Sequence, residues 1–279
     1  MQDLEALVVD AAAAHEEASW RLHTRYHRAF TISHLGRDYF VKYDCAATFW
    51  PEIRTQRYIS KYATKSSSIG VPRIPRILHA FEQSDHPAPF AYALMEWIEL
   101  THLPLEDTQW QERIKGAVCW LATVPVPDGH VLGPLGGRMR HGFFKDYEAP
   151  FQFTSLDALE RYVNRARMLF GRKAEGHIPW ISFAGEKAIF LQADMHAGNY
   201  GVDSEGRIVL LDFGTIGVVP ESFALLTLKF RFPTIAEALQ LPKSCRTNLM
   251  WLSEISHRLQ FAGDTLGLDE NGILQPKTT

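Results

Sequence analysis

Two short motifs place carboxylates and an amide at spacings that suit the transfer of a phosphoryl group. Asp194 and Asn199 lie five positions apart in the segment ADMHAGN, and Asp212 follows in LLDFG. Phosphoryl transfer from a nucleoside triphosphate requires a carboxylate near the acceptor hydroxyl and oxygen ligands that hold Mg²⁺ against the phosphates. We therefore predict that Asp194 faces an acceptor hydroxyl and that Asn199 and Asp212 bind the metal. Taken alone, Asp and Asn near a turn are ordinary loop residues.

The two motifs resemble those of the aminoglycoside phosphotransferase and choline kinase superfamily, which shares the protein-kinase-like fold. That family has a loop of the form His-Gly-Asp-Leu-His-x-x-Asn, followed by a strand that ends in Asp. His196 matches the second His of the family loop, whereas Gln192 and Ala193 replace the usual His and Gly. The resemblance implies an α+β, bilobal fold, with a small antiparallel-sheet N-terminal lobe and a larger, mainly helical C-terminal lobe.

The resemblance also assigns roles to a lysine and a glutamate far upstream. In a kinase-like fold a strand Lys contacts the α and β phosphates, and a Glu from the following helix holds this Lys. Lys42 lies on a predicted strand, YFVKY, and Glu52 follows ten positions later in the first turn of a predicted helix. A strand Lys often points to solvent, and a first-turn Glu often serves the helix dipole. Their order relative to the two motifs favours the kinase-like interpretation.

The segment YALMEWIEL stands where the family places its interlobe connector, which reads adenine through backbone groups. By resemblance, Met95 lies at the back of the nucleotide pocket, the Glu96 carbonyl accepts from the adenine amino group, and the Ile98 amide donates to a ring nitrogen. An apolar strand that leads into a charged segment could equally lack any nucleotide. Before Lys42 the sequence has only Gly36 and no G-x-G-x-x-G run, which favours small-molecule kinases over protein kinases and leaves the phosphate-covering loop unassigned.

Hydrophobic periodicity and turn residues predict the elements that position these residues. In chain order they are a helix over 3–19, strands over 27–33 and 37–43, a helix over 48–62, strands over 77–82 and 90–98, helices over 110–124 and 155–170, a strand hairpin around the turn 204–206, and helices after Pro220 nearly to the end. The Pro/Gly-rich stretch 125–150 is either a substrate-facing lid or an irregular surface insertion. We expect an N-terminal nucleotide-binding lobe, with the connector, over 1–98 and a helical lobe with the catalytic loop and substrate site over 99–279.

Composition excludes several other classes of protein. The 279 residues carry 29 Lys+Arg and 32 Asp+Glu, a net charge of −3, so the whole chain has no electrostatic bias toward nucleic acid or anionic membranes. No apolar run approaches the ~18 residues of a membrane span, and no export signal is recognisable. Cys45, Cys119 and Cys245 are odd in number and widely spaced, which predicts no disulfide framework or metal site. We expect a cytoplasmic protein.

These observations predict an ATP-dependent kinase for a hydroxyl of a small molecule, with ATP and Mg²⁺ as cofactors. The acceptor is not identified. Trp180, Glu221, Trp251 and Glu254 would suit a wall around a cationic acceptor. On amphipathic helices, however, Trp and acidic residues more often form the core and the solvated face.

Two alternative functions remain open at this stage. The altered Gln192-Ala193 pair and the missing glycine loop favour a pseudokinase that binds nucleotide or acts as a scaffold. A protein kinase fits less well, because no Ala-Pro-Glu segment of an activation loop follows Asp212. The sequence does not predict the oligomeric state.

Overall fold

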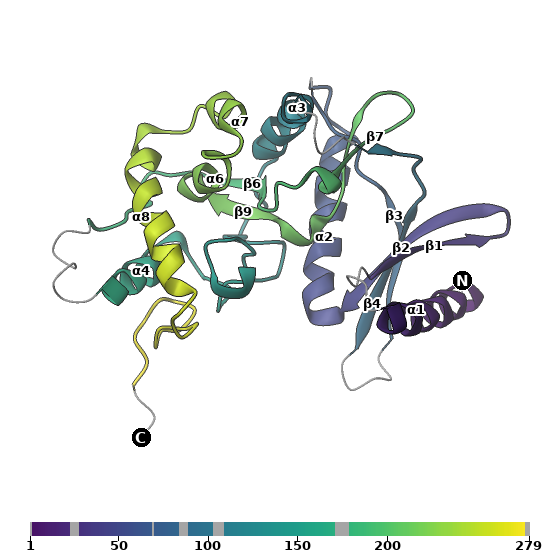
Figure 1. Ribbon diagram of the computed structural model, residues 1–279, viewed down its shortest axis with the longest axis horizontal. Coiled ribbons are helices and arrows are strands. Elements are labelled where there is room, and N and C mark those ends of the chain that lie inside the picture. The colour runs from purple at the N-terminus through teal and green to yellow at the C-terminus, as the bar shows by residue number, and fades with distance from the viewer. Residues whose placement is uncertain are drawn as a thin grey trace.

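The N-terminal lobe is built on one four-stranded antiparallel sheet (Figure 1). The computed structural model describes residues 2–22, 28–68, 70–83, 89–102, 109–170 and 179–276. Neighbouring strands follow the order β1-β2-β4-β3. Their bounds are Ala29–His34 for β1, Arg37–Cys45 for β2, Ile77–Gln83 for β3 and Phe90–Glu96 for β4. The antiparallel N-terminal sheet predicted from the sequence is thus confirmed.

A tight turn joins β1 to β2. Its two central residues, Leu35 and Gly36, have φ values of 49° and 73°. Positive φ at both positions characterises the type I′ turn, whose twist matches that of paired strands, and glycine adopts this conformation without a steric penalty. The hairpin therefore has no extended glycine-rich loop at its tip.

Two helices cover opposite faces of this sheet. Helix α1 (Gln2–Leu22) packs on the face that carries Val41 and Tyr43, and helix α2 (Ala46–Ala63) packs on the face that carries Phe40. Because successive side chains of a strand point to opposite faces, Lys42 shares the α2 face with Phe40. Burial of Val41 and Tyr43 against α1 thus directs Lys42 toward α2.

The C-terminal lobe is mainly helical and holds two small sheets (Figure 1). Its strands are β5 (Thr101–His102), β6 (Ala188–Gln192), β7 (Tyr200–Val202), β8 (Ile208–Leu210) and β9 (Ile216–Pro220). Its helices are α3 (Trp110–Thr123), α4 (Leu156–Arg167), α6 (Glu221–Leu228), α7 (Pro233–Ala238) and α8 (Lys243–Leu259). Short 3₁₀ turns lie at Lys145–Tyr147, Met168–Phe170, Ala197–Asn199 and Phe213–Thr215. The predicted hairpin is the antiparallel β7–β8 pair, and β6 pairs with β9. Beyond Leu259 the prediction of helix is wrong, because Gly267 and Gly272 adopt positive φ and the chain turns.

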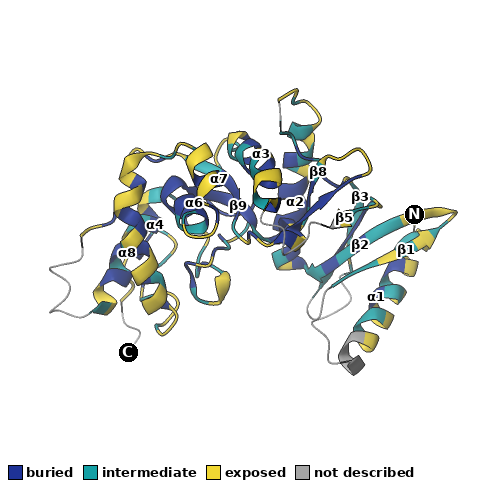
Figure 2. Cartoon of the chain, turned by 45° about the horizontal axis from the view of Figure 1, so that its top comes forward, coloured by how far each residue is buried: buried dark blue, intermediate teal, exposed yellow. Residues whose placement is uncertain are grey.

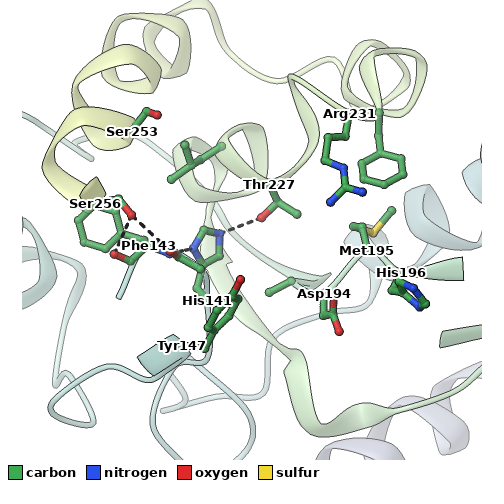
Figure 3. A pocket seen from close by; sticks show the side chains of 14 residues that line it. His141, Phe143, Tyr147, Asp194, Met195, His196, Thr227, Arg231, Ser253 and Ser256 are labelled. Atoms are coloured by element: carbon green, nitrogen blue, oxygen red, sulfur yellow. Dashed lines mark hydrogen bonds between the residues drawn. The ribbon is translucent and has the colours of Figure 1, made fainter. Parts of the chain in front are cut away.

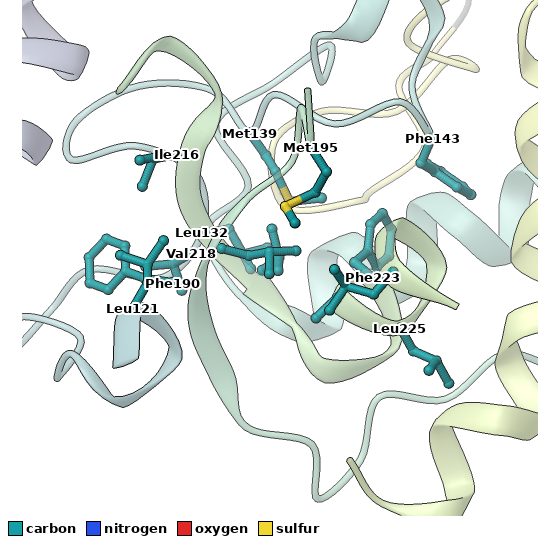
Figure 4. Close-up of a cluster of buried hydrophobic side chains, with 14 of the residues drawn as sticks. Leu121, Leu132, Met139, Phe143, Phe190, Met195, Ile216, Val218, Phe223 and Leu225 are labelled. Carbon is teal, nitrogen blue, oxygen red and sulfur yellow. The ribbon is translucent and has the colours of Figure 1, made fainter. Parts of the chain in front are cut away.

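The core of the C-terminal lobe surrounds the β6–β9 pair (Figure 4). Phe190 of β6, Val218 of β9 and Phe223 of α6 are fully buried, and Met195 is buried in the same cluster. Burying such a side chain contributes about 1.5–3 kcal/mol. Since Met195 directly follows Asp194, this apolar packing holds the backbone that presents the Asp194 carboxylate.

The stretch 125–150 divides into two parts with different surroundings. Its first part packs under α2: the Leu135 amide donates to Thr55 Oγ1 at 2.8 Å, and Arg54 Nε donates to the Leu135 carbonyl at 2.9 Å. The Gly133 amide and carbonyl both pair with Val218 of β9 at 2.8 Å. This part is therefore a strut between the two lobes and not a lid, whereas the residues that follow it line a pocket described below.

The strut covers the side of α2 that carries Arg54 and Thr55, while the sheet covers the opposite side, so the helix is buried along much of its length at the junction of the lobes (Figure 2). A second junction lies at Arg73, whose amide donates to the Ile208 carbonyl at 2.8 Å and whose carbonyl accepts from the Leu210 amide at 2.9 Å. The chain itself crosses between the lobes in residues 97–100, since β4 ends at Glu96 and β5 pairs with β7. Among the helices of the described residues, none has an apolar stretch that could span a bilayer.

Candidate functional site

Lys42 forms ion pairs with two carboxylates that lie far apart in the sequence. Lys42 Nζ lies 2.5 Å from Glu52 Oε1 and 2.7 Å from Asp212 Oδ1. The side chain of Glu52 is 8% exposed, whereas that of Asp212 is 41% exposed. Glu52 is therefore the buried anchor of Lys42, and Asp212 faces the open side of the site.

Glu52 occupies a different place in its helix from the one predicted. Helix α2 begins at Ala46, so its first turn holds no acidic residue, and Pro51 and Glu52 come one turn later. The alternative in which Glu52 serves the helix dipole therefore does not apply, because the helix dipole acts within the first turn. The carboxylate instead contacts Lys42, the residue that the resemblance pairs with it.

A strained backbone presents Asp212. Its φ of 46° and ψ of 83° place it in the left-handed region, and its Oδ1 accepts from the Gly214 amide at 3.2 Å. A non-glycine residue in this region costs about 1–2 kcal/mol. Phe213 is fully buried and anchors the turn. A Cβ at Gly214 would lie 3.1 Å from Glu52 Oε2 and 3.2 Å from Asp212 Oδ1, so a side chain here would crowd both carboxylates.

Burial and mutual attraction together set the charges of this cluster. Burial lowers the pKa of Lys42, but Glu52 and Asp212 more than offset this effect and hold that pKa above its ordinary value. Burial raises the pKa of Asp212, but Lys42 and the Gly214 amide bring it below its ordinary value. Burial also raises the pKa of Glu52, and Lys42 only partly reverses this effect. At neutral pH the Lys42 ammonium group and the Asp212 carboxylate are thus both charged and lie in contact.

Asp194 and Asn199 are joined within one turn of the loop between β6 and β7. Asn199 Nδ2 donates to the Asp194 carbonyl at 2.8 Å and to Asp194 Oδ2 at 3.3 Å. The Asn199 amide donates to the His196 carbonyl, and His196 Nδ1 accepts from the Gly198 amide. Because Nδ2 is occupied, Asn199 Oδ1 remains as the oxygen that can bind a cation, while the exposed Asp194 faces solvent.

Gln192 connects this loop to the turn that carries Asp212. Its buried Nε2 donates to the Asp212 carbonyl at 2.9 Å, and its Oε1 accepts from the Asp194 amide at 3.3 Å and from the Thr215 hydroxyl. The Ala193 amide also donates to the Thr215 carbonyl. The Gln192 side chain therefore fixes the relative position of the two motifs, a contribution that sequence analysis did not assign to it.

A pocket of about 290 Å³ opens beside Asp194 (Figure 3). Its walls come from four segments of the C-terminal lobe: the second part of the 125–150 stretch, the Asp194 loop, the end of α6 with the connection to α7, and α8. The lining residues are His141, Gly142, Phe143, Tyr147, Ala193, Asp194, Met195, His196, Leu226, Thr227, Arg231, Phe232, Ser253 and Ser256. Of these, only Asp194 and its loop neighbours were singled out by the sequence.

His141 forms the buried end of this pocket. Its Nδ1 accepts from the Phe143 amide at 3.0 Å, and its Nε2 lies 2.8 Å from Thr227 Oγ1 and 3.2 Å from the Phe223 carbonyl. Burial lowers the pKa of His141 to about 4. The imidazole is therefore neutral at pH 7, with its proton on Nε2.

The connector residues lie at the end of β4. Met95 is buried, and its Sδ lies 3.2 Å from Gln56 Nε2. The Glu96 carboxylate accepts from the Arg76 amide at 3.0 Å. The Ile98 amide has no hydrogen-bond partner within the described ranges.

The residues considered as walls for a cationic acceptor do not line the pocket. Trp180 is 71% exposed and lies under the guanidinium of Arg167 at 4.0 Å. Glu221 is buried and accepts from the Lys187 amide. Trp251 packs against the core and Glu254 is exposed. These two residues therefore fit the alternative in which Trp belongs to the core and an acidic residue to the solvated face.

A family model matches the part of the chain that holds both motifs. Residues 182–237 match the model of the ABC1 atypical kinase-like domain. This segment is similar to an atypical kinase. The match spans less than half of the chain and runs from the strand before Asp194 to α7. Together with the antiparallel sheet, the Lys42–Glu52 pair and the order of the motifs, it confirms the protein-kinase-like fold that the resemblance implied.

Several solved structures of small-molecule kinases are also similar to this chain. A microcompartment-associated aminopropanol kinase has 16% identity over 85% of this chain and 80% of its own, with a TM-score of 0.46. Aminoglycoside phosphotransferase APH(4)-Ia has 14% identity over 85% and 90%, with a TM-score of 0.46. Spectinomycin phosphotransferase APH(9)-Ia, in complex with ADP and spectinomycin, has 14% identity over 87% and 80%, with a TM-score of 0.47. No curated protein matches the sequence significantly.

Proposed function

We propose that the protein is an ATP-dependent phosphotransferase that phosphorylates a hydroxyl of a small molecule. One observation carries the proposal: Lys42 contacts both Glu52 and Asp212, which lies 170 positions away, at 2.5 and 2.7 Å. In a kinase-like fold this contact joins the phosphate-binding lysine to the metal-binding carboxylate. The link from Asp212 through Gln192 to Asp194 supports an acceptor site beside it.

The nucleotide would lie between the two lobes. Lys42, positioned by Glu52, would steady the α and β phosphates. Met95 would form the back of the adenine pocket, the Glu96 carbonyl would accept from the adenine amino group, and the Ile98 amide, which has no partner in the described residues, would donate to the ring. In this proposal residues 1–98 form the nucleotide-binding lobe and residues 99–279 carry the catalytic loop and the acceptor site.

Asn199 and Asp212 would hold Mg²⁺. They offer an amide oxygen and a carboxylate, which suits a cation that also binds phosphates and water. No group of three or more His, Cys, Asp or Glu that could hold a metal by itself occurs in the described ranges. When bound, Mg²⁺ would neutralise charge on the phosphates.

Asp194 would orient the acceptor hydroxyl and take its proton. In the transfer, the acceptor oxygen bonds to the γ phosphorus while the bond from this phosphorus to the bridging oxygen breaks. ADP leaves with the bridging oxygen and the bonding electrons. Since the transition state of such transfers is loose, positioning and charge neutralisation by these residues account for most of the catalysis.

The test is Mg²⁺-dependent ADP formation with a panel of hydroxylated acids, sugars and amino alcohols. We expect at least one acceptor to stimulate ADP formation in the wild type, and Asp212→Asn to abolish this stimulation. ATP binding without any Mg²⁺-dependent turnover across the panel would instead support the pseudokinase alternative. Transfer to a protein but to no small molecule would support a protein kinase.

A further inference from the structure

The polar groups of the pocket beside Asp194 divide into those that are already paired and those that are free. Ser256 Oγ donates to the Phe143 carbonyl at 3.0 Å. Thr227 Oγ1 donates to the Phe223 carbonyl at 3.2 Å and lies 2.8 Å from His141. These hydroxyls and the imidazole therefore hold the wall together and have little capacity left for a ligand.

Three lining side chains have no such partner. Within the described part of the chain, the side chains of Arg231, Tyr147 and Ser253 make no hydrogen bond or ion pair. Figure 3 shows the Arg231 side chain extending from the α6–α7 connection toward Thr227 and Met195. The pocket thus offers a ligand one guanidinium and two hydroxyls, in addition to Asp194 and to Nε2 of His196, whose Nδ1 accepts from the Gly198 amide.

Tyr147 is held at the pocket by an unusual backbone. Asp146 and Tyr147 have φ values of 54° and 62°, and the Tyr147 carbonyl accepts from the His141 amide at 3.0 Å. Two consecutive non-glycine residues in the left-handed region cost about 1–3 kcal/mol each. Tyr147 is 69% exposed in this conformation while it lines the pocket.

The balance of charge in the pocket opposes a cationic ligand. Among the described lining residues Asp194 is the single carboxylate, and the proposed reaction already uses it. The neighbouring Asp264 pairs with Lys145, and Glu148 pairs with Arg140. Asp146, which precedes Tyr147 and forms no ion pair with the described residues, does not line the pocket. An ammonium group bound here would therefore meet Arg231 with Asp194 as the single carboxylate among the described lining residues.

We propose that the acceptor is a small hydroxy acid whose carboxylate binds Arg231 while its hydroxyl lies at Asp194. This inference rests on the proposed phosphotransferase function, because it places the reacting hydroxyl at Asp194. The planar guanidinium presents parallel N–H groups that match a carboxylate, and one cation balances one such charge. Tyr147 and Ser253 would bind further hydroxyls of the acceptor.

The size of the pocket limits the acceptor. A volume of about 290 Å³ is at the lower end for ligand pockets and equals the space of about ten water molecules. An open-chain acid of about six carbons fits this space.

The test compares ligands that share a carbon skeleton and differ in charge. The first set has six carbons: gluconate carries a carboxylate, sorbitol carries no charge, and glucamine carries an ammonium group. Glycerate, glycerol and serinol form the corresponding set with three carbons. Binding of each to the full-length protein is measured by calorimetry, together with ADP formation. We expect each acid to bind at least about tenfold tighter than its cationic counterpart, the effect of one charged hydrogen-bonded pair.

Arg231→Glu should reverse this ranking. Arg246→Glu makes the same change of charge on an exposed residue of α8 outside the pocket, so it should leave the ranking of the wild type unchanged. Three results would overturn the inference. They are tighter binding of the cations by the wild type, failure of both acids to bind at millimolar concentration, and an unchanged ranking in Arg231→Glu. Turnover of cationic acceptors would show that the protein is a kinase but that its acceptor is not a hydroxy acid. Binding that favours the acids without any turnover would support the carboxylate site at Arg231 and contradict the proposed kinase activity.

Discussion

Acidification should destabilise the protein through His141, because the folded structure buries this imidazole without a charge. Both ring nitrogens are hydrogen-bonded, and burial lowers the pKa of His141 from 6.5 to about 4. The unfolded chain therefore takes up a proton near pH 6.5, and the folded chain does so only near pH 4. Since the folded pKa is the lower one, the contribution of His141 to stability is complete above pH 6.5 and falls as the pH decreases toward 4.

The size of this effect follows from the difference between the two pKa values. About 2.5 pKa units correspond to about 3 kcal/mol of unfolding free energy when the pH falls below both values. Between pH 7 and about pH 5.5 the loss amounts to about 1.2 kcal/mol. Because His141 and Phe143 both line the pocket beside Asp194, protonation of Nδ1 would also break the hydrogen bond that the Phe143 amide donates to it.

The assay is urea unfolding at pH 7 and at about pH 5.5 for the wild type and for His141→Asn. The variant should lose stability at both pH values but should lack the additional loss of about 1.2 kcal/mol at the lower pH. His34→Asn removes a partly exposed histidine of β1 and should follow the wild type. An equal dependence on pH in the wild type and His141→Asn would show that His141 does not cause the loss of stability.

Three further predictions concern helix α2 and the turn that carries Asp212. Glu52→Gln should lower kcat/KM for ATP about 10- to 100-fold, because Lys42 loses its buried anchor; steady-state kinetics would show this, and an unchanged value would contradict it. Gly214→Ala should reduce turnover at least about tenfold, because its Cβ would lie 3.1 Å from Glu52 Oε2 and 3.2 Å from Asp212 Oδ1. Gly263 has open space around it, so Gly263→Ala should leave turnover unchanged in the same assay. Thr55→Val should cost about 1–3 kcal/mol in urea unfolding, because the Leu135 amide loses its acceptor; a loss no larger than that of the exposed Thr64→Val would argue against the strut.

Local patterns were sufficient to predict the elements that carry the site. The alternation in YFVKY places Lys42 on one face of a strand, and the Gly36 turn ends the preceding strand, so the β1–β2 hairpin could be predicted. The motifs around Asp194 and Asp212 flank a hairpin that also follows from turn residues. The bilobal, kinase-like fold could be predicted because these signals occur in the family's order.

The pocket beside Asp194 could not be predicted in the same way. Arg231, Tyr147 and His141 belong to no motif, and they meet only because the α6–α7 connection and the 141–147 turn fold onto the same loop. The start of α2 was placed too late, because Pro51 and Glu52 together are typical of a first helical turn. The strut under α2 depends on Thr55 and Leu135, 80 positions apart, and has no local signal.

The proposed phosphotransferase activity depends above all on Asp194. The measurement is transfer of the γ phosphate from radiolabelled ATP to an acceptor in the presence of Mg²⁺, together with the affinity for Mg²⁺-ATP, for the wild type and Asp194→Asn. We expect the variant to lose turnover by about 10²-fold or more, as when a positioned base is removed, while nucleotide affinity changes little. Unchanged turnover in Asp194→Asn would contradict this expectation.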